Sequence, residues 1–164
     1  MGRKSTKENK NIYQISREDS DLTRDAAAEA LGFISADRIE KIENEKTMPH
    51  PDEILAMAEC YKKPNLCNYY CSHECPIGQK HVPEVKMKDL SQITLEVLAA
   101  LNTLEKEKNR FIEITMDGII SSDELTDFRR INEQLSQIAT TVSALQLWIQ
   151  QATIDHKIAE SPEE

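Results

Sequence analysis

A long stretch without proline occupies the second half of the chain and favours helices there. Residues 87–158 contain no proline, and from residue 128 onward the apolar residues recur at steps of three and four. This spacing returns an apolar side chain to the same helix face in every turn, as in the seam of a coiled coil. The residues of the expected seam are Phe128, Ile131, Leu135, Ile138, Val142, Leu145 and Ile149.

A second apolar stripe precedes this seam. It consists of Leu90, Val97, Leu101, Leu104 and Phe111, with Thr94 and Lys108 as interruptions. Between the two stripes, the segment MDGIISSDE contains a glycine and then a Ser-Asp-Glu helix start. We therefore expect residues 87–158 to form a long antiparallel helical hairpin. Two such hairpins, one from each subunit, would make a four-helix homodimer.

The composition favours an all-α fold. The 164 residues are 39% apolar and 30% charged and include only four glycines, whereas sandwiches and barrels need many turn residues. No apolar run approaches the ~20 residues of a membrane span. The basic N-terminus has no apolar segment behind it, so we expect no secretory signal there. These features predict a cytoplasmic protein that does not enter the membrane.

The first half of the chain carries signals for several short helices. Thr23 is a good N-cap for RDAAAEAL, which Gly32 ends, and Ser35 is a good N-cap for ADRIEKIENEK. Pro51 stands where a helix would begin. The buried stripe expected for that helix is Ile54, Leu55, Ala58 and Tyr61.

Two helices joined by a short turn with a glycine, each with an apolar face, make a helix-turn-helix. The stretch LTRDAAAEALGFISADRIEKIENEKTMPHPDEILAMAECY, residues 22–61, resembles the Cro/phage-repressor (Xre-like) helix-turn-helix regulators. The features that match are Leu22-Thr23, Ala28, Leu31-Gly32, Ile39, Ile42-Glu43, Pro49 and Ala58 with Tyr61.

The resemblance implies that the protein has a surface that binds double-stranded DNA. The helix after residue 35 would enter the major groove, with its N-terminal side chains on base edges. The residues expected to face DNA there are Ser35, Ala36, Asp37, Arg38 and Lys41. Arg38 is the best candidate for reading a guanine. Arg24 would contact a phosphate, and Lys4, Lys7 and Lys10 could follow the DNA backbone.

The charge pattern keeps an alternative open. The net charge is -9; residues 1–66 hold 11 Lys and Arg against 13 Asp and Glu, and residues 67–164 hold 9 against 16. Phosphate contacts supply most non-specific DNA affinity, and the expected recognition helix itself carries Asp37, Glu40, Glu43 and Glu45. The alternative is a protein-interaction adaptor whose helix-turn-helix is a scaffold that no longer binds DNA.

Four cysteines lie close together in the sequence, at Cys60, Cys67, Cys71 and Cys75. If residues 66–74 are helical, the last three share one face, and together with Cys60 or a histidine (His73 or His81) they could hold zinc or an iron–sulfur cluster. The other interpretation is that they are buried small side chains. With metal or redox chemistry, the protein would be a responsive version of the same regulator.

The cysteine segment carries a second resemblance. LCNYYCSHECPIG is similar to a stretch found in a group of bacterial Xre-like regulators that also have a C-terminal helical part. The organisation expected from all these features is a disordered basic arm (1–11), a helix-turn-helix domain (12–64), a Cys-rich connector (65–86), the hairpin (87–158) and a disordered tail (159–164).

Enzyme motifs are missing from the sequence. It has no glycine-rich phosphate loop, no G-x-S-x-G and no H-E-x-x-H. We therefore expect no catalytic activity. The function expected is that of a sequence-specific DNA-binding transcriptional regulator, acting as a dimer on a palindromic operator.

Overall fold

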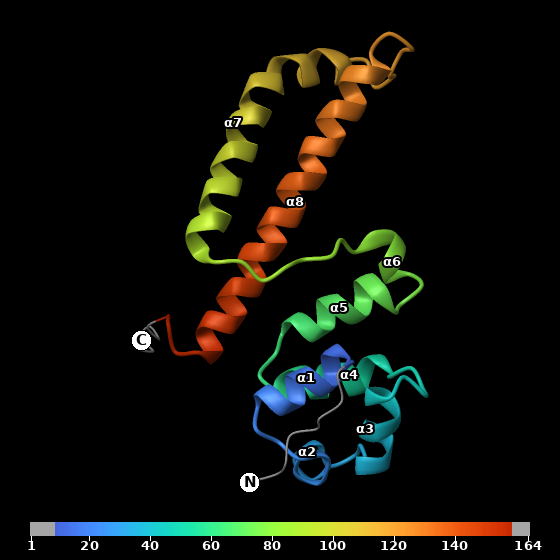
Figure 1. Ribbon diagram of the computed structural model, residues 1–164. Helices are drawn as coiled ribbons and strands as arrows, with labels where there is room; N and C mark the ends of the chain where they lie inside the picture. Colours follow the sequence, from blue (N-terminus) through green and yellow to red (C-terminus); the bar gives the residue numbers. More distant parts are fainter. Residues whose placement is uncertain (1–8, 159–164) are drawn as a thin grey trace, which may run out of the picture. The chain divides into compact units, whose positions relative to one another are not determined.

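The chain is all-helical in the computed structural model, which describes residues 9–158 (Figure 1). The expected tail and most of the expected basic arm, including Lys4 and Lys7, lie outside the described residues. The helices are α1 (Ile12–Asp19), α2 (Arg24–Leu31), α3 (Ala36–Glu43), α4 (Pro51–Cys60), α5 (Asn65–His73), α6 (Gly78–His81), α7 (Leu90–Thr115) and α8 (Leu125–Ile154). No strand occurs in residues 9–158, so the prediction of an all-α fold is confirmed.

The chain divides into two compact units. The first contains the described residues up to Glu84 and those from Gln150 onward, and the second is Val85–Ile149. The short helices α1 to α6 belong to the first unit and the long helix α7 to the second.

The helix boundaries of the first unit follow local capping chemistry. The side chain of Thr23 accepts a hydrogen bond from the backbone N–H of Ala26 at 3.1 Å, and Ser35 caps α3 in the same way. Gly32 ends α2 with φ +76°, a left-handed conformation that strains residues with a Cβ. The expected N-caps and the expected glycine stop are all confirmed.

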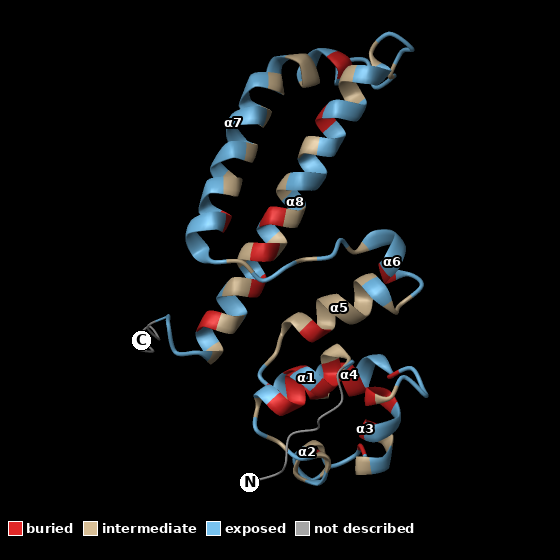
Figure 2. Cartoon of the chain, in the orientation of Figure 1, coloured by how far each residue is buried: buried red, intermediate tan, exposed pale blue. Residues whose placement is uncertain are grey.

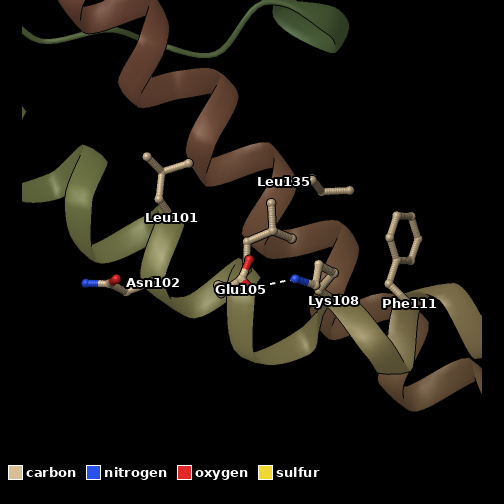
Figure 3. A pocket seen from close by; sticks show the side chains of 7 residues that line it. Leu101, Asn102, Glu105, Lys108, Phe111 and Leu135 are labelled. Carbon is tan, nitrogen blue, oxygen red and sulfur yellow. Dashed lines mark hydrogen bonds and ion pairs between the residues drawn. The ribbon is translucent and has the colours of Figure 1, made fainter.

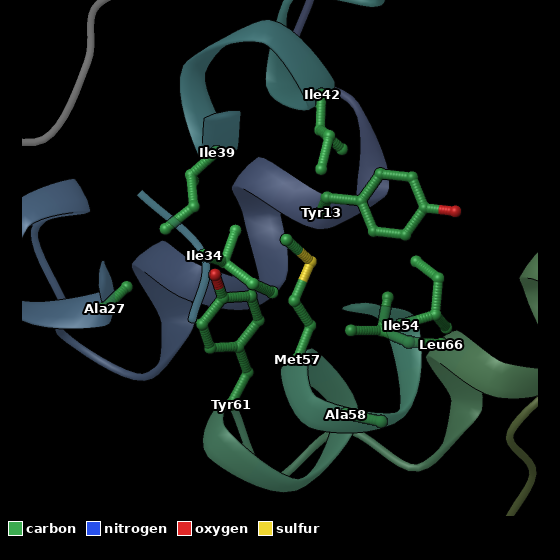
Figure 4. Packing of buried hydrophobic residues seen from close by; sticks show 10 residues of the cluster. All are labelled: Tyr13, Ala27, Ile34, Ile39, Ile42, Ile54, Met57, Ala58, Tyr61 and Leu66. Carbon is green, nitrogen blue, oxygen red and sulfur yellow. The ribbon is translucent and has the colours of Figure 1, made fainter. Parts of the chain in front are cut away.

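The core of the first unit draws on helices α1 to α5 and the turn between α2 and α3. Figure 4 shows these buried side chains directed toward one another. It contains Tyr13, Ala27, Ile34, Ile39, Ile42, Ile54, Met57, Ala58, Tyr61 and Leu66. The stripe expected on α4 was wrong at one place. Leu55 is 59% exposed, and Met57 is buried instead, because positions 54, 57, 58 and 61 share one face of a helix whereas 55 does not.

The expected Cys-rich connector is largely helical. Leu66 on α5 is fully buried and belongs to the core of the first unit. Gly78, at the start of α6, lies against the backbone of α5, where a Cβ would collide with the carbonyl group of Cys71. Only glycine fits this close approach, which fixes where α6 follows α5.

In the second unit, α7 and the part of α8 up to Ile149 run antiparallel, joined by a turn with Gly118 at φ +74° (Figure 1). Two ion pairs link the helices near this turn, Arg110 with Asp127 at 2.8 Å and Arg130 with Glu107 at 2.8 Å. The expected helical hairpin is therefore present. Figure 2 shows that much of both helices is exposed along this pair.

The apolar seam of α8 is only partly covered within one chain. Ile131 is fully buried, but Leu135, Val142 and Ile149, which are spaced seven residues apart, are 36%, 43% and 43% exposed. None of the helices in residues 9–158 is long and apolar enough to cross a membrane.

Candidate nucleic-acid interface

In the helix pair α2–α3, helix α3 has one side buried in the core and the opposite side exposed to solvent. Ile39 and Ile42 of α3 are 1% exposed and pack into the core. The opposite side of α3 carries polar and charged side chains in solvent, namely Ser35, Asp37, Glu40 and Lys41. The hydroxyl of Ser35 caps the helix by accepting from the backbone N–H of Arg38 at 3.2 Å. An exposed polar face on a short, well-capped helix can be presented to a large partner.

A buried carboxylate ties three helices together beneath this surface. Glu43 of α3 is 0% exposed. The guanidinium of Arg17 in α1 donates to both of its oxygens, at 2.6 Å and 3.0 Å, and Nε of Arg24 in α2 donates to it at 2.8 Å. Arg17 also donates to the carbonyl oxygen of Leu22 at 2.5 Å. A buried charge needs partners of this kind, so this network fixes α3 against α1 and α2.

Arg24, the expected phosphate ligand, lies at the N-terminus of α2. Its Nε is engaged with Glu43, and its side chain remains one-third exposed. The backbone N–H groups of the first turn of a helix and its dipole favour anions at this end. The position of Arg24 is thus compatible with a role both in the buried network and at the surface.

Arg38 is held within the protein by four hydrogen bonds. Its Nε and one terminal nitrogen each donate to Glu53 of α4 at 2.8 Å. The remaining two bonds go to the hydroxyl of Thr47 at 2.7 Å and the carbonyl oxygen of Met48 at 2.9 Å. A guanidinium has five N–H donors, so nearly all of its capacity joins α3 to the following loop and α4.

The electrostatics of this pair agree with the geometry. The hydrogen bond from Arg38 holds the pKa of Glu53 below its ordinary value, despite an opposing effect of burial. Glu53 also accepts from the backbone N–H of His50 at 2.7 Å, at the start of α4. The Arg38–Glu53 pair therefore stabilises the N-terminus of α4 as well as the placement of α3.

The outer face of α3 carries an exposed ion pair at helical spacing. Nζ of Lys41 lies 2.7 Å from Oδ2 of Asp37, and the two side chains are 48% and 73% exposed. Because Glu43 is turned inward, the exposed side of α3 is less acidic than the sequence of this helix suggests.

The prediction of a cysteine cluster was wrong. All four cysteines are free thiols, and no group of three or more His, Cys, Asp or Glu side chains within residues 9–158 could hold a metal ion. The expected shared face of Cys67, Cys71 and Cys75 ends because α5 stops at His73, and Cys75 instead accepts from the backbone N–H of Gly78 at 3.4 Å. Cys60, Cys67, Cys71 and Cys75 therefore form no zinc or iron–sulfur site in the structure.

Cys60, Cys67 and the nearby His73 are packed against other side chains. Burial raises the pKa of the Cys60 and Cys67 thiols, which favours the neutral form. His73, a candidate nitrogen ligand, stacks on Tyr69 with ring centroids 4.4 Å apart. This arrangement agrees with the interpretation of small side chains packed against the core.

Sequence reasoning missed the inward-facing charges. Glu43 follows the buried Ile42, and Glu53 precedes the buried Ile54. A charged residue next to the apolar stripe of a short helix is a signal for a buried ion pair, but it does not identify the partner.

Comparison with known families identifies the domain. The Helix-turn-helix family model matches residues 15–64, which run from within α1 to the residue before α5. This region is a helix-turn-helix domain, a motif that in DNA-binding proteins places its second helix in the major groove. It is of the Xre/Cro type found in DNA-binding regulators. A search of curated proteins and a search of solved structures each found no match to the chain.

Proposed function

We propose that the protein is a sequence-specific transcriptional regulator that binds a palindromic operator as a homodimer, in the cytoplasmic compartment that holds the DNA. The observation that carries the proposal is the outer face of α3. It is exposed, polar and rigidly supported in a helix-turn-helix domain of the Xre/Cro type. A helix in this position reads the major groove with the side chains of its N-terminal part.

We assign different tasks to the expected DNA-facing residues. Ser35, Ala36 and Asp37 lie at the N-terminal end of α3 and Lys41 lies in its last turn, on the same side as Asp37; we assign all four to contacts with base edges. Arg24 would bind a phosphate, which anchors the domain without reading sequence. Arg38, with its guanidinium engaged by Glu53, would position α3 and take no part in base recognition.

The test is a binding selection from a random duplex library with the purified full chain, at ~50 mM and ~200 mM salt. The proposal predicts a palindromic motif and an affinity that falls as salt rises. Failure to enrich any motif at the lower salt concentration would contradict it and would favour the adaptor function.

Dimerisation is proposed through the second unit. The heptad positions Leu135, Val142 and Ile149 are exposed in a single chain, although their spacing is that of a packed seam. These side chains are already more than half buried, so covering the exposed remainder supplies about 0.5–1.3 kcal/mol each. A partner hairpin with the same stripe would cover them symmetrically.

An apolar hollow beside this seam is also consistent with the proposed dimer of two hairpins. It has a volume of about 430 Å³ and is lined by Leu101, Asn102, Leu104, Glu105, Lys108, Phe111 and Leu135 (Figure 3). Lys108, which interrupts the stripe of α7, pairs with Glu105 at 2.6 Å. This ion pair keeps the two charges together and leaves apolar lining for a partner's side chains.

The oligomeric state provides the test of this part. Light scattering on the purified chain should give twice the monomer mass of 18.7 kDa. Val142→Lys should yield monomers, whereas Gln137→Lys, the same change at an exposed polar position of α8, should leave the dimer intact. A monomeric wild-type chain would contradict the proposed dimer.

A further inference from the structure

The exposed ion pair on α3 indicates which base pair the domain would bind. Asp37 and Lys41 lie on the outer face of the helix, with the carboxylate and ammonium 2.7 Å apart. A carboxylate has about four lone-pair sites and an ammonium has three donors. Their ion pair therefore leaves acceptors on Asp37 and donors on Lys41 available to a ligand.

The spacing of the two charged groups matches one base-pair edge. In the major groove, cytosine presents its N4 amino donor and guanine presents the O6 and N7 acceptors. N4 and O6 are hydrogen-bonded to each other in the base pair, so they lie ~2.9 Å apart. The ion pair offers the complementary acceptor and donor at nearly the same separation.

The same comparison disfavours an A·T pair. Adenine also has an amino donor, but its N7 acceptor would lie beside the carboxylate of Asp37 and repel it. Thymine has an acceptor at O4, but its methyl group would lie beside the ammonium of Lys41 in place of the guanine N7. Both ends of the ion pair thus favour C·G.

We propose that Asp37 and Lys41 act together as a specificity-determining pair that reads one C·G base pair in each half-site. Asp37 accepts from cytosine N4, and Lys41 donates to guanine O6 and N7. This inference rests on the proposed DNA-binding function and names the base pair that the site takes. Because the ion pair is neutral, it contributes sequence discrimination and little non-specific affinity.

The experiment compares four full-length chains in the same binding selection, followed by fluorescence anisotropy on the selected duplex and on duplexes changed at single base pairs. The chains are wild type, Asp37→Asn, Lys41→Gln and the control Glu59→Gln. The control removes one negative charge from an exposed position on α4. Thermal melts verify that each chain is folded, as expected for exposed positions.

The wild type should prefer C·G over A·T at one position of the half-site by about 5- to 150-fold. Asp37→Asn should shift that position toward A·T, because asparagine bonds adenine N6 and N7. Lys41→Gln should reduce the preference at the same position, and Glu59→Gln should keep the wild-type motif. The inference is overturned if the wild type selects a motif that Asp37→Asn and Lys41→Gln both leave unchanged. If the wild type selects no motif, the proposed function itself fails.

Discussion

Replacing Arg38 with methionine separates its proposed structural role from a role in reading a base. The side chain is only 24% exposed, and that of its partner Glu53 is 10% exposed. The substitution keeps most of the aliphatic stem but removes four hydrogen bonds, two of them to a carboxylate. Removing one partner of a buried ion pair costs ~3–5 kcal/mol, whereas exposed pairs contribute ~0–1 kcal/mol.

Because this pair lies between those limits, we expect Arg38→Met to lower the free energy of unfolding by about 2–3 kcal/mol. With a urea dependence of ~1–3 kcal/mol per molar, the unfolding midpoint should fall by about 0.7–3 M. The matched control on the same helix is Lys41→Met, which breaks the exposed pair with Asp37 and should cost less than ~1 kcal/mol.

The pH dependence has a defined sign. The pKa of Glu53 lies below the ordinary value of 4.5, chiefly because of its hydrogen bond with Arg38. The stabilisation by the pair is therefore fully present above pH 4.5 and is lost as the pH falls through the lowered pKa. The difference between wild type and Arg38→Met should shrink in that acidic range. A variant of wild-type stability that loses preference at a single base pair would refute this reasoning and make Arg38 a base reader.

Three other substitutions, the first with a matched control, test the packing of the first unit by urea unfolding. Arg17→Met leaves the fully buried Glu43 without its main partner and should lower the free energy of unfolding by about 3–5 kcal/mol. The control Lys63→Met, at a partly exposed ion pair, should lower it by less than ~1 kcal/mol. Equal losses in the two variants would contradict the argument. Burial raises the pKa of Glu74 above 4.5. The folded protein therefore loses stability as the pH rises through this raised pKa and the buried carboxyl group ionises. Glu74→Gln should be more stable than wild type at pH 7 and no more stable at pH 4. Gly78→Ala places a Cβ against the backbone of α5 and should cost ~1–3 kcal/mol, whereas an unchanged midpoint would show that α6 can shift freely.

The parts of the fold that follow from local chemistry could be predicted from the sequence. Thr23 and Ser35 form their N-caps with backbone groups three residues away, so a short window contains both partners. The hairpin followed from the missing prolines and the 3-4 spacing, which are also local properties. The family resemblance of the helix-turn-helix region depended on such local signals as well.

The long-range pairs could not be predicted in this way. Arg38 and Glu53 are 15 residues apart, and Arg17 and Glu43 are 26 residues apart. Which charge meets which depends on how α1, α3 and α4 pack. Counting charges along α3 therefore overstated its acidity, since the inward-facing Glu43 does not contribute to the outer face.

The error over the cysteines has a similar origin. Spacings of four residues put side chains on one face only while the helix continues, and α5 ends at His73, before Cys75. The position of that end depends on the chain reversal into α6, where Gly78 lies against α5. A sequence pattern alone did not place this reversal.

The most direct test of the central claim is to map the DNA contacts on the chain. Amide chemical shifts of the ¹⁵N-labelled full chain would be followed by NMR during titration with the selected duplex, and with a duplex of scrambled sequence as the control. The account predicts the largest changes at residues 35–41 of α3 and at the N-terminus of α2 around Arg24, with changes on α3 only for the selected duplex. Changes confined to the second unit, or equal changes on α3 with both duplexes, would contradict sequence-specific reading by this helix.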